Sequence, residues 1–361
     1  FSLLINMNKL LLNKEIYRYS NMIEKQIKLK SLLSYDFNII KKSTNLKKNF
    51  KQDLLIRLAK RSTELENLPY GLSSMPSICK LSKCYINSFN ELYNFENVSD
   101  EKNLVNLLKN IYDRHTETSE KITGGLKELN SNLSEKYNED IFEYLKTNGH
   151  LPFGSFKKLN DSIDLFYTHR FSVRLLIDQY INYDNNIPNY IGVINKKMYP
   201  SVIIKDAVDD ALEICKFNYD DYPEVKINLI SNPTLTYVPS YLYYVIFELV
   251  KNAIRATMES ENKQPIEIIL SGEKDIVIKI SDKGKGIKFP ELERVWFYSY
   301  TSVSDNYYNN KLEQNNVLAG FGFGLPVSRA TIKFLGGDIK LMSVENYGTD
   351  VYISLPSEDW Y

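Results

Sequence analysis

The residues whose types and spacing could do chemistry begin with a carboxylate and a carboxamide, Glu248 and Asn252, in an apolar stretch with helical periodicity. In a helix, a spacing of four residues places both side chains on one face. Their oxygens suit a hydrated Mg²⁺ ion, and the carboxylate could also orient a hydroxyl or a water for in-line attack. Arg255 can flank the pair. A solvated polar stripe has the same pattern, so this segment alone leaves both interpretations open.

A second segment, 281–287, follows a strand-like stretch and contains Asp282, Gly284 and Gly286. At the end of a strand, Asp282 could accept a hydrogen bond from an exocyclic amine such as that of adenine. Glycines allow backbone angles that are closed to other residues, and they let a ligand approach the backbone closely. An ordinary turn has a similar composition, so the segment alone does not separate a binding loop from a simple turn.

A third segment alternates glycines directly ahead of a helix, an arrangement that leaves backbone N–H groups free to hold phosphate at a positive helix end. Thr349, in a turn at the start of the last strand, could help to hold an adenine ring beside Asp282. The candidate phosphate-binding residues are Gly320, Phe321, Gly322, Phe323, Gly324 and Leu325.

The elements that must position these residues make up the C-terminal half of the chain. Periodicity and turn residues predict helices and strands in alternation, including hairpins at 271–273 and 346–348. Such a series favours a two-layer α/β sandwich. The predicted helices are 201–215, 239–260 and 326–334, and the predicted strands are 226–230, 266–270, 276–280, 339–344 and 349–355.

The N-terminal half is different, because long amphipathic stretches from 27 to 181 alternate with short breaks and predict a helical, four-helix bundle. We expect a bundle domain at 24–183, a polar linker at 184–200 and the site-bearing domain at 201–361. Residues 1–23 are apolar and basic with one acid, which fits either an organelle-targeting segment or a disordered start.

The composition argues against several classes of protein. The chain has 361 residues with 45 basic and 45 acidic side chains, so charge predicts neither a nucleic-acid nor a membrane partner. No apolar run reaches the ~18 residues of a membrane span, so we expect no transmembrane segment. Three cysteines without a CxxC pair and three histidines make a zinc site or a disulfide framework improbable.

The order of the three boxes, 248–255, 282–286 and 320–324, resembles the ATP site shared by type II topoisomerases, heat-shock chaperones, mismatch-repair ATPases and sensor histidine kinases. A closer resemblance is to the mitochondrial kinases of 2-oxoacid dehydrogenase complexes, pyruvate dehydrogenase kinase and branched-chain 2-oxoacid dehydrogenase kinase. It extends over 238–256, 280–284, 319–326 and 348–350, and into the helical half at 113–115 and 166–174.

This resemblance implies a serine kinase that uses ATP and Mg²⁺ and inhibits the E1 subunit of a dehydrogenase complex in the mitochondrial matrix. It implies a helical half that docks the lipoyl domain of E2 and an ATP-binding half that dimerises. The loop 302–319 would be a lid over ATP. The implied roles are base for Glu248, magnesium ligand for Asn252, phosphate support for Lys251 and Arg255, adenine recognition for Asp282, and the edge of the nucleotide site for Thr301 and Ser302.

The sequence leaves three questions open: the effect of Tyr244 on the base, the substrate complex, and whether phosphate is transferred to a protein at all. Tyr244 stands where pyruvate dehydrogenase kinases commonly have a histidine, one turn before the base. Residues 256–260 and 322–324 lean towards the branched-chain kinase, whereas residues 298–302 lean towards pyruvate dehydrogenase kinase, so the pattern does not decide between the two complexes. The alternative function is an ATP-gated conformational or scaffold protein that binds nucleotide without transferring phosphate to a protein.

Overall fold

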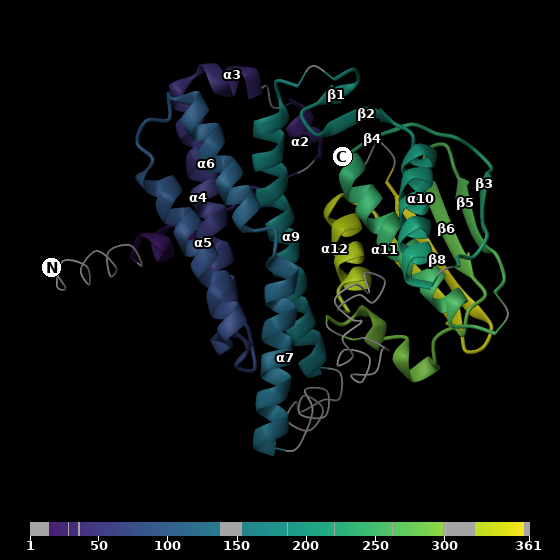
Figure 1. The fold of residues 1–361 in the computed structure, drawn as a ribbon. Coiled ribbons are helices and arrows are strands. Elements are labelled where there is room, and N and C mark those ends of the chain that lie inside the picture. The colour runs from purple at the N-terminus through teal and green to yellow at the C-terminus, as the bar shows by residue number, and fades with distance from the viewer. Residues whose placement is uncertain are drawn as a thin grey trace. The chain divides into compact units, whose positions relative to one another are not determined.

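The computed structural model describes residues 14–27, 29–34, 37–137, 154–185, 187–219, 221–261, 263–298, 300 and 322–356. They group into two compact units (Figure 1). The first contains the described residues up to 185 except 29 and 30. The second contains those from 187 onward together with 29 and 30.

The first unit is helical, as the amphipathic periodicity predicted. Helix α4 packs on α5 and α9, while α5 also packs on α7 and α6 on α9. Apolar positions such as Leu54 and Leu58 are fully buried between these helices. The elements are α2 (Leu29–Ser34), α3 (Phe37–Lys42), α4 (Thr44–Glu66), η1 (Leu72–Ser74), α5 (Pro76–Asn94), α6 (Glu101–Arg114), α7 (Thr118–Tyr137) and α9 (Gly154–Asn182).

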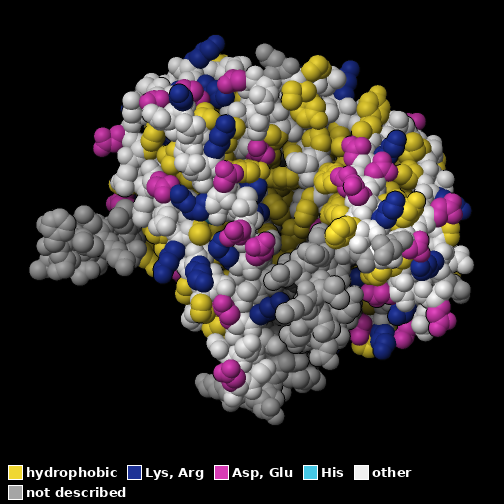
Figure 2. All heavy atoms as spheres, viewed as in Figure 1, with side chains coloured by type: hydrophobic (Ala, Val, Ile, Leu, Met, Phe, Trp, Pro, Cys, Tyr) yellow, Lys and Arg dark blue, Asp and Glu magenta, His cyan; other side chains and the backbone are white. Residues whose placement is uncertain are grey.

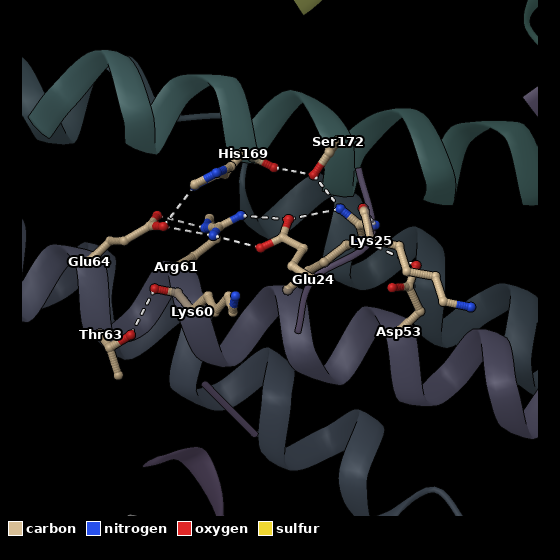
Figure 3. Close-up of polar contacts among 10 residues, drawn as sticks. Glu24, Lys25, Asp53, Lys60, Arg61, Thr63, Glu64, His169 and Ser172 are labelled. Carbon is tan, nitrogen blue, oxygen red and sulfur yellow. Dashed lines mark hydrogen bonds and ion pairs between the residues drawn. The ribbon is translucent and has the colours of Figure 1, made fainter. Parts of the chain in front are cut away.

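A buried ionic network ties the segment that precedes α2 to α4 and α9 (Figure 3). Arg57 and Arg61 of α4 are 1% and 0% exposed, and Glu24 pairs with both of them at 2.8 and 3.1 Å. Arg61 also pairs with Glu64, which lies 2.7 Å from Nδ1 of His169 on α9. Because the two guanidinium groups are buried, removal of an acid that neutralises them would leave an uncompensated buried charge.

The second unit has a five-stranded sheet in the order β3-β5-β6-β8-β7, in which only the β3–β5 pair is parallel. Helices α10, α11 and α12 pack together, with α11 on β5 and β6 and α12 on β7 (Figure 1). This confirms the two-layer sandwich. The elements are β1 (Tyr190–Ile191), β2 (Ile194–Met198), α10 (Pro200–Tyr219), β3 (Val225–Leu229), β4 (Leu235–Tyr237), α11 (Pro239–Met258), β5 (Ile266–Ser271), β6 (Ile276–Asp282), η2 (Phe289–Glu291), η3 (Arg294–Trp296), α12 (Gly324–Phe334), β7 (Asp338–Val344) and β8 (Gly348–Leu355).

The segment 184–200 differs from the linker that its polarity suggested, because β1 and β2 lie within it and form a second sheet with β4. Ile194 and Met198 of β2 are buried, but the register shifts between Asn195 and Met198. That irregularity breaks the alternation by which a strand is recognised in sequence. Strand β4 has only three residues, and it was missed for its shortness.

The surface carries both signs of charge. On the face drawn in Figure 2, basic and acidic side chains of the described residues lie interspersed, as the balanced composition leads one to expect. Among the helices that the structure describes, none is long and apolar enough to cross a membrane.

Candidate nucleotide-binding site

A cavity of about 490 Å³ lies in the second unit where α11, the end of β6, the β7–β8 hairpin and the start of α12 meet. It draws on each of the sequence segments that were singled out for chemistry. The sequence-predicted residues that line it are Glu248, Asn252, Arg255, Asp282, Gly286, Gly322, Gly324, Leu325 and Thr349.

Helix α11 begins with Pro239 at its first turn, where the missing proline N–H costs no helical hydrogen bond. Its apolar positions, Val245 and Ile246 among them, are buried where the helix packs on the sheet and on α10 and α12. This packing turns Glu248, Asn252 and Arg255 toward the cavity, as the spacing of three and four residues predicted. The carboxylate and the carboxamide therefore share one wall.

Lys251 lies in a different place from the one expected for a phosphate contact. It is 6% exposed and is absent from the residues that line the cavity. Its Nζ lies 2.9 Å from Oε1 of Glu248 and 5.5 Å from the centre of the Phe247 ring. In this structure the lysine therefore contacts the carboxylate from behind the cavity wall.

The start of α12 meets Glu248 directly. A Cβ atom added to Gly324 would lie only 2.3 Å from Oε2 of Glu248. Any larger residue would therefore displace the carboxylate. The free N–H groups of a helix start attract negative charge, so this corner of the cavity joins an anion-binding end to a carboxylate.

Asp282, the last residue of β6, is 6% exposed and accepts a hydrogen bond from the N–H of Gly284 at 2.9 Å. The backbone N–H of Thr349 also donates to this carboxylate. Burial is the main reason that the pKa of Asp282 rises to about 6, although these two donors oppose the rise. The carboxylate is thus held in place with little contact to water.

Two glycines let the turn after Asp282 lie against its neighbours. A Cβ at Gly284 would meet the backbone of Ala256 on α11 at 2.6 Å. Gly286 has φ +64°, and a Cβ there would meet the carbonyl oxygen of Val344 at 2.0 Å. The glycines are required by close approach to α11 and β7, and Gly284 itself does not line the cavity.

Apolar residues that the sequence reasoning missed cover the wall around Asp282 and Thr349. Ile280 on β6 pairs with Val351 on β8. Two residues further along each strand, Asp282 pairs with Thr349. Because side chains alternate along a strand, each member of this group faces the same side. The strand period could have identified Ile280 and Val351. The missed apolar residues include Leu249, Ala253, Ile280, Leu341 and Val351.

Of the remaining sequence-predicted residues, Phe323 is buried away from the cavity and the others are not described by the structure. Phe323 is 5% exposed, and its ring packs 5.3 Å from that of Tyr298 instead of lining the cavity. Its apolar character decides this placement, because burial against another ring stabilises it. Thr301, Ser302, Gly320, Phe321 and the loop 302–319 lie outside the described residues.

Comparison with known proteins gives the class first. Residues 237–359 match the family model of histidine kinase-, DNA gyrase B- and HSP90-like ATPases, so the second unit carries an ATPase domain of that class. Residues 26–195 match the model of mitochondrial branched-chain alpha-ketoacid dehydrogenase kinase.

Relatives that match nearly the whole chain give the family. The chain is 30% identical to the mitochondrial pyruvate dehydrogenase (acetyl-transferring) kinase of Arabidopsis thaliana, over 95% of this chain and 93% of the relative. It is 32% identical to isozyme 3 of that kinase from Mus musculus, over 95% and 83%, and 32% identical to human isozyme 1, over 86% and 72%. The chain belongs to the pyruvate dehydrogenase kinase family and is a protein kinase, which decides against the ATP-gated scaffold.

Proposed function

We propose that this chain is an ATP- and Mg²⁺-dependent serine kinase that phosphorylates, and so inhibits, the E1 subunit of a mitochondrial 2-oxoacid dehydrogenase complex. The observation that carries the proposal is the cavity in which Glu248, Asn252, Asp282 and the start of α12 converge. The relatives are named as kinases of pyruvate dehydrogenase, so the pyruvate complex is the first substrate to test.

In this proposal the apolar wall and Asp282 take the adenine ring. Ile280 and Val351 would flank the base, and the Asp282 carboxylate would accept from its exocyclic amine. Since Asp282 is nearly inaccessible to water, such a bond would be worth more than one at the surface. The triphosphate would then point toward Arg255 and the first turn of α12, where Gly324 leaves the backbone bare.

The donor set fits Mg²⁺, because this ion keeps several waters and needs few protein oxygens beside the phosphates. Asn252, whose side chain faces the cavity, would supply one of them. The ion would neutralise phosphate charge during transfer.

Glu248 would act as the base. As the substrate serine oxygen attacks the γ-phosphorus, its proton would pass to the Glu248 carboxylate while the bond to the ADP oxygen breaks. The contact from Lys251 to Oε1 leaves Oε2 as the oxygen nearer to the start of α12. That arrangement supports a carboxylate oriented toward the γ-phosphate.

We further propose a homodimer formed through the second unit. Strand β7 is an edge of the five-stranded sheet, and Met342 and Val344 on it are 66% and 63% exposed. An exposed apolar edge invites pairing with another chain, and a second copy would cover it. The lipoyl domain of E2 as the partner of the helical unit and the matrix as the location are proposed on the family alone.

The test of the function is label transfer. Purified pyruvate and branched-chain complexes would each be incubated with the protein, Mg²⁺ and γ-labelled ATP. We expect label on a serine of one E1 subunit and a fall in the activity of that complex. Binding of ATP with no label on either E1 subunit would contradict the proposal.

A further inference from the structure

The hydroxyl of Ser343 on β7 has three hydrogen-bond partners beside the proposed adenine contact. It accepts from the N–H of Ile287 at 2.8 Å, donates to the carbonyl oxygen of Gly348 at 3.0 Å, and lies 2.8 Å from Oγ1 of Thr349. These partners belong to the turn after Asp282 and to the start of β8, the two segments that form one end of the cavity. Ser343 itself does not line the cavity.

The number of protons decides the direction of the bond between the two hydroxyls. A serine hydroxyl has one proton to donate. A carbonyl oxygen only accepts, so the contact with Gly348 uses the proton of Ser343. Thr349 must then donate its own proton to Ser343, which leaves its oxygen with lone pairs alone to offer a ligand.

Asp282 and Thr349 therefore present the same kind of group to the cavity. They are register partners on β6 and β8, and both line the cavity. An ionised carboxylate only accepts hydrogen bonds, and the threonine oxygen is restricted to accepting by Ser343. A ligand edge that meets these two acceptors must bring N–H groups. A carbonyl oxygen in the same place would face acceptors and lose its hydrogen bond to water.

We propose that Ser343, by taking the proton of Thr349, makes this cavity selective for 6-aminopurine nucleotides over 6-oxopurine nucleotides. Ser343 is thus a positioning residue that acts through Thr349. This inference rests on the proposed adenine contact of Asp282 and Thr349.

Other contacts also hold the β7–β8 hairpin against the turn after Asp282. Loss of the Ser343 hydroxyl therefore need not displace that turn. The N–H of Asn346 donates to the carbonyl oxygen of Lys285 at 2.7 Å. The Nζ of Lys283 lies 4.5 Å from the centre of the Tyr347 ring. Both contacts join the β7–β8 turn to the turn after Asp282, and neither involves the side chain of Ser343.

The experiment compares ATP with ITP, which carries a carbonyl oxygen in place of the 6-amino group. Calorimetry on the full chain with Mg²⁺ would give the ratio of the two dissociation constants for wild type, Ser343→Ala and Ser343→Thr. We expect wild type to prefer ATP. Ser343→Ala frees the Thr349 proton to donate to ITP and should lower that preference about tenfold, the worth of one hydrogen bond in such a site. Ser343→Thr keeps the hydroxyl and should retain the wild-type ratio.

A double-mutant comparison separates this role from a structural one. In a Thr349→Val background, Ser343→Ala should leave the ATP-to-ITP ratio unchanged, because there is no threonine proton to release. Equal weakening of both nucleotides by Ser343→Ala, or an unchanged ratio, would overturn the inference while leaving the proposed function intact. A folded wild type that bound neither nucleotide would overturn both.

Discussion

The ammonium group of Lys251 lies 2.9 Å from Oε1 of Glu248, three residues earlier on the same helix. The pair is nearly buried, with side chains 7% and 13% exposed. At the position one turn before the base, where a pyruvate dehydrogenase kinase is expected to have a histidine, this chain has Tyr244. Lys251 is therefore a positive group in direct contact with the proposed base.

Replacement of Lys251 by methionine should separate orientation of the base from phosphate binding. Because the lysine touches Glu248 and not the cavity, we expect kcat to fall about 10- to 100-fold, as for a misoriented base. The dissociation constant of ATP should change less than about threefold, since no phosphate contact is lost. The measurements are steady-state kinetics and nucleotide calorimetry, with Lys274→Met, at an exposed turn, as control. Loss of ATP binding with intact turnover at saturation would restore the phosphate role.

Gly324→Ala should damage the site without unfolding the domain. The new methyl group would lie 2.3 Å from Oε2 of Glu248, so the carboxylate must move. We expect kcat to fall at least about tenfold from misplacement of the base. Thermal unfolding of the variant should stay close to that of wild type, because the substitution lies at a cavity wall. Wild-type turnover by a folded Gly324→Ala protein would show that Oε2 does not act where the structure has it.

The affinity for ATP should depend on pH through Asp282, whose pKa burial raises to about 6. Below pH 6 the carboxyl is neutral and a poorer acceptor, so ATP affinity should fall as the pH drops through this value. The folding stability of the ATP-free protein should change in the opposite direction. A raised pKa of Asp282 contributes stability at low pH that is lost as the pH rises through about 6. Calorimetry from pH 5 to 8 would measure the first trend.

Asp282→Asn provides the matched control for this pH dependence. The phosphates of ATP also titrate in this range, but they do so equally with both proteins. The difference between wild type and variant therefore isolates the carboxyl. Parallel pH profiles for the two proteins would contradict the assignment of Asp282 as the group that titrates on binding.

Glu24→Gln should destabilise the helical unit. The change removes the charge that neutralises Arg57 and Arg61, and we expect a loss of about 1–3 kcal/mol in the free energy of unfolding. Burial alone would raise the pKa of Glu24, but Arg61 and Arg57 bring it below its usual value. A lowered pKa contributes stability above the unfolded pKa that is lost as the pH falls through the folded pKa.

The difference between wild type and Glu24→Gln should therefore shrink as the pH falls below about 4. Urea unfolding at pH 7 and pH 3 measures it. Asp161→Asn, at an exposed position inside α9, is the control and should be neutral at both pH values. A Glu24→Gln protein as stable as wild type at pH 7 would show that the ionic network of Figure 3 does not hold the unit together.

The proposed dimer can be tested on strand β7. Met342→Lys adds a charge to an exposed edge position and should yield monomers at micromolar concentration, because burying an unpaired charge in an interface is costly. Sedimentation velocity measures the mass of wild type and variant. Lys340→Arg, which keeps the charge on the same strand, is the control. A dimer that withstands Met342→Lys would place the interface elsewhere.

Part of this site could be predicted because it depends on local periodicity. Helical spacing placed Glu248 and Asn252 on one face, and the end of a strand placed Asp282 at the end of β6 that meets the cavity. The sandwich followed from the same patterns. These features need only the repeat of a helix or strand.

Other parts depend on side-chain torsions and on strand register, which a single sequence does not contain. Lys251 could point either to the cavity or to Glu248, and helical spacing allows both. Ser343 reaches Thr349 because β7 and β8 pair in one particular register. The shifted register of β2 concealed a strand in what reads as a polar linker.

The most direct test of the central claim separates binding from transfer at Glu248. Wild type, Glu248→Gln and the exposed control Glu213→Gln would be mixed with Mg²⁺, γ-labelled ATP and the E1-containing complex that wild type phosphorylates, and sampled by rapid quench. We predict that Glu248→Gln binds ATP but transfers label at least about 100-fold more slowly than wild type and Glu213→Gln. Transfer by Glu248→Gln at the wild-type rate would contradict the account.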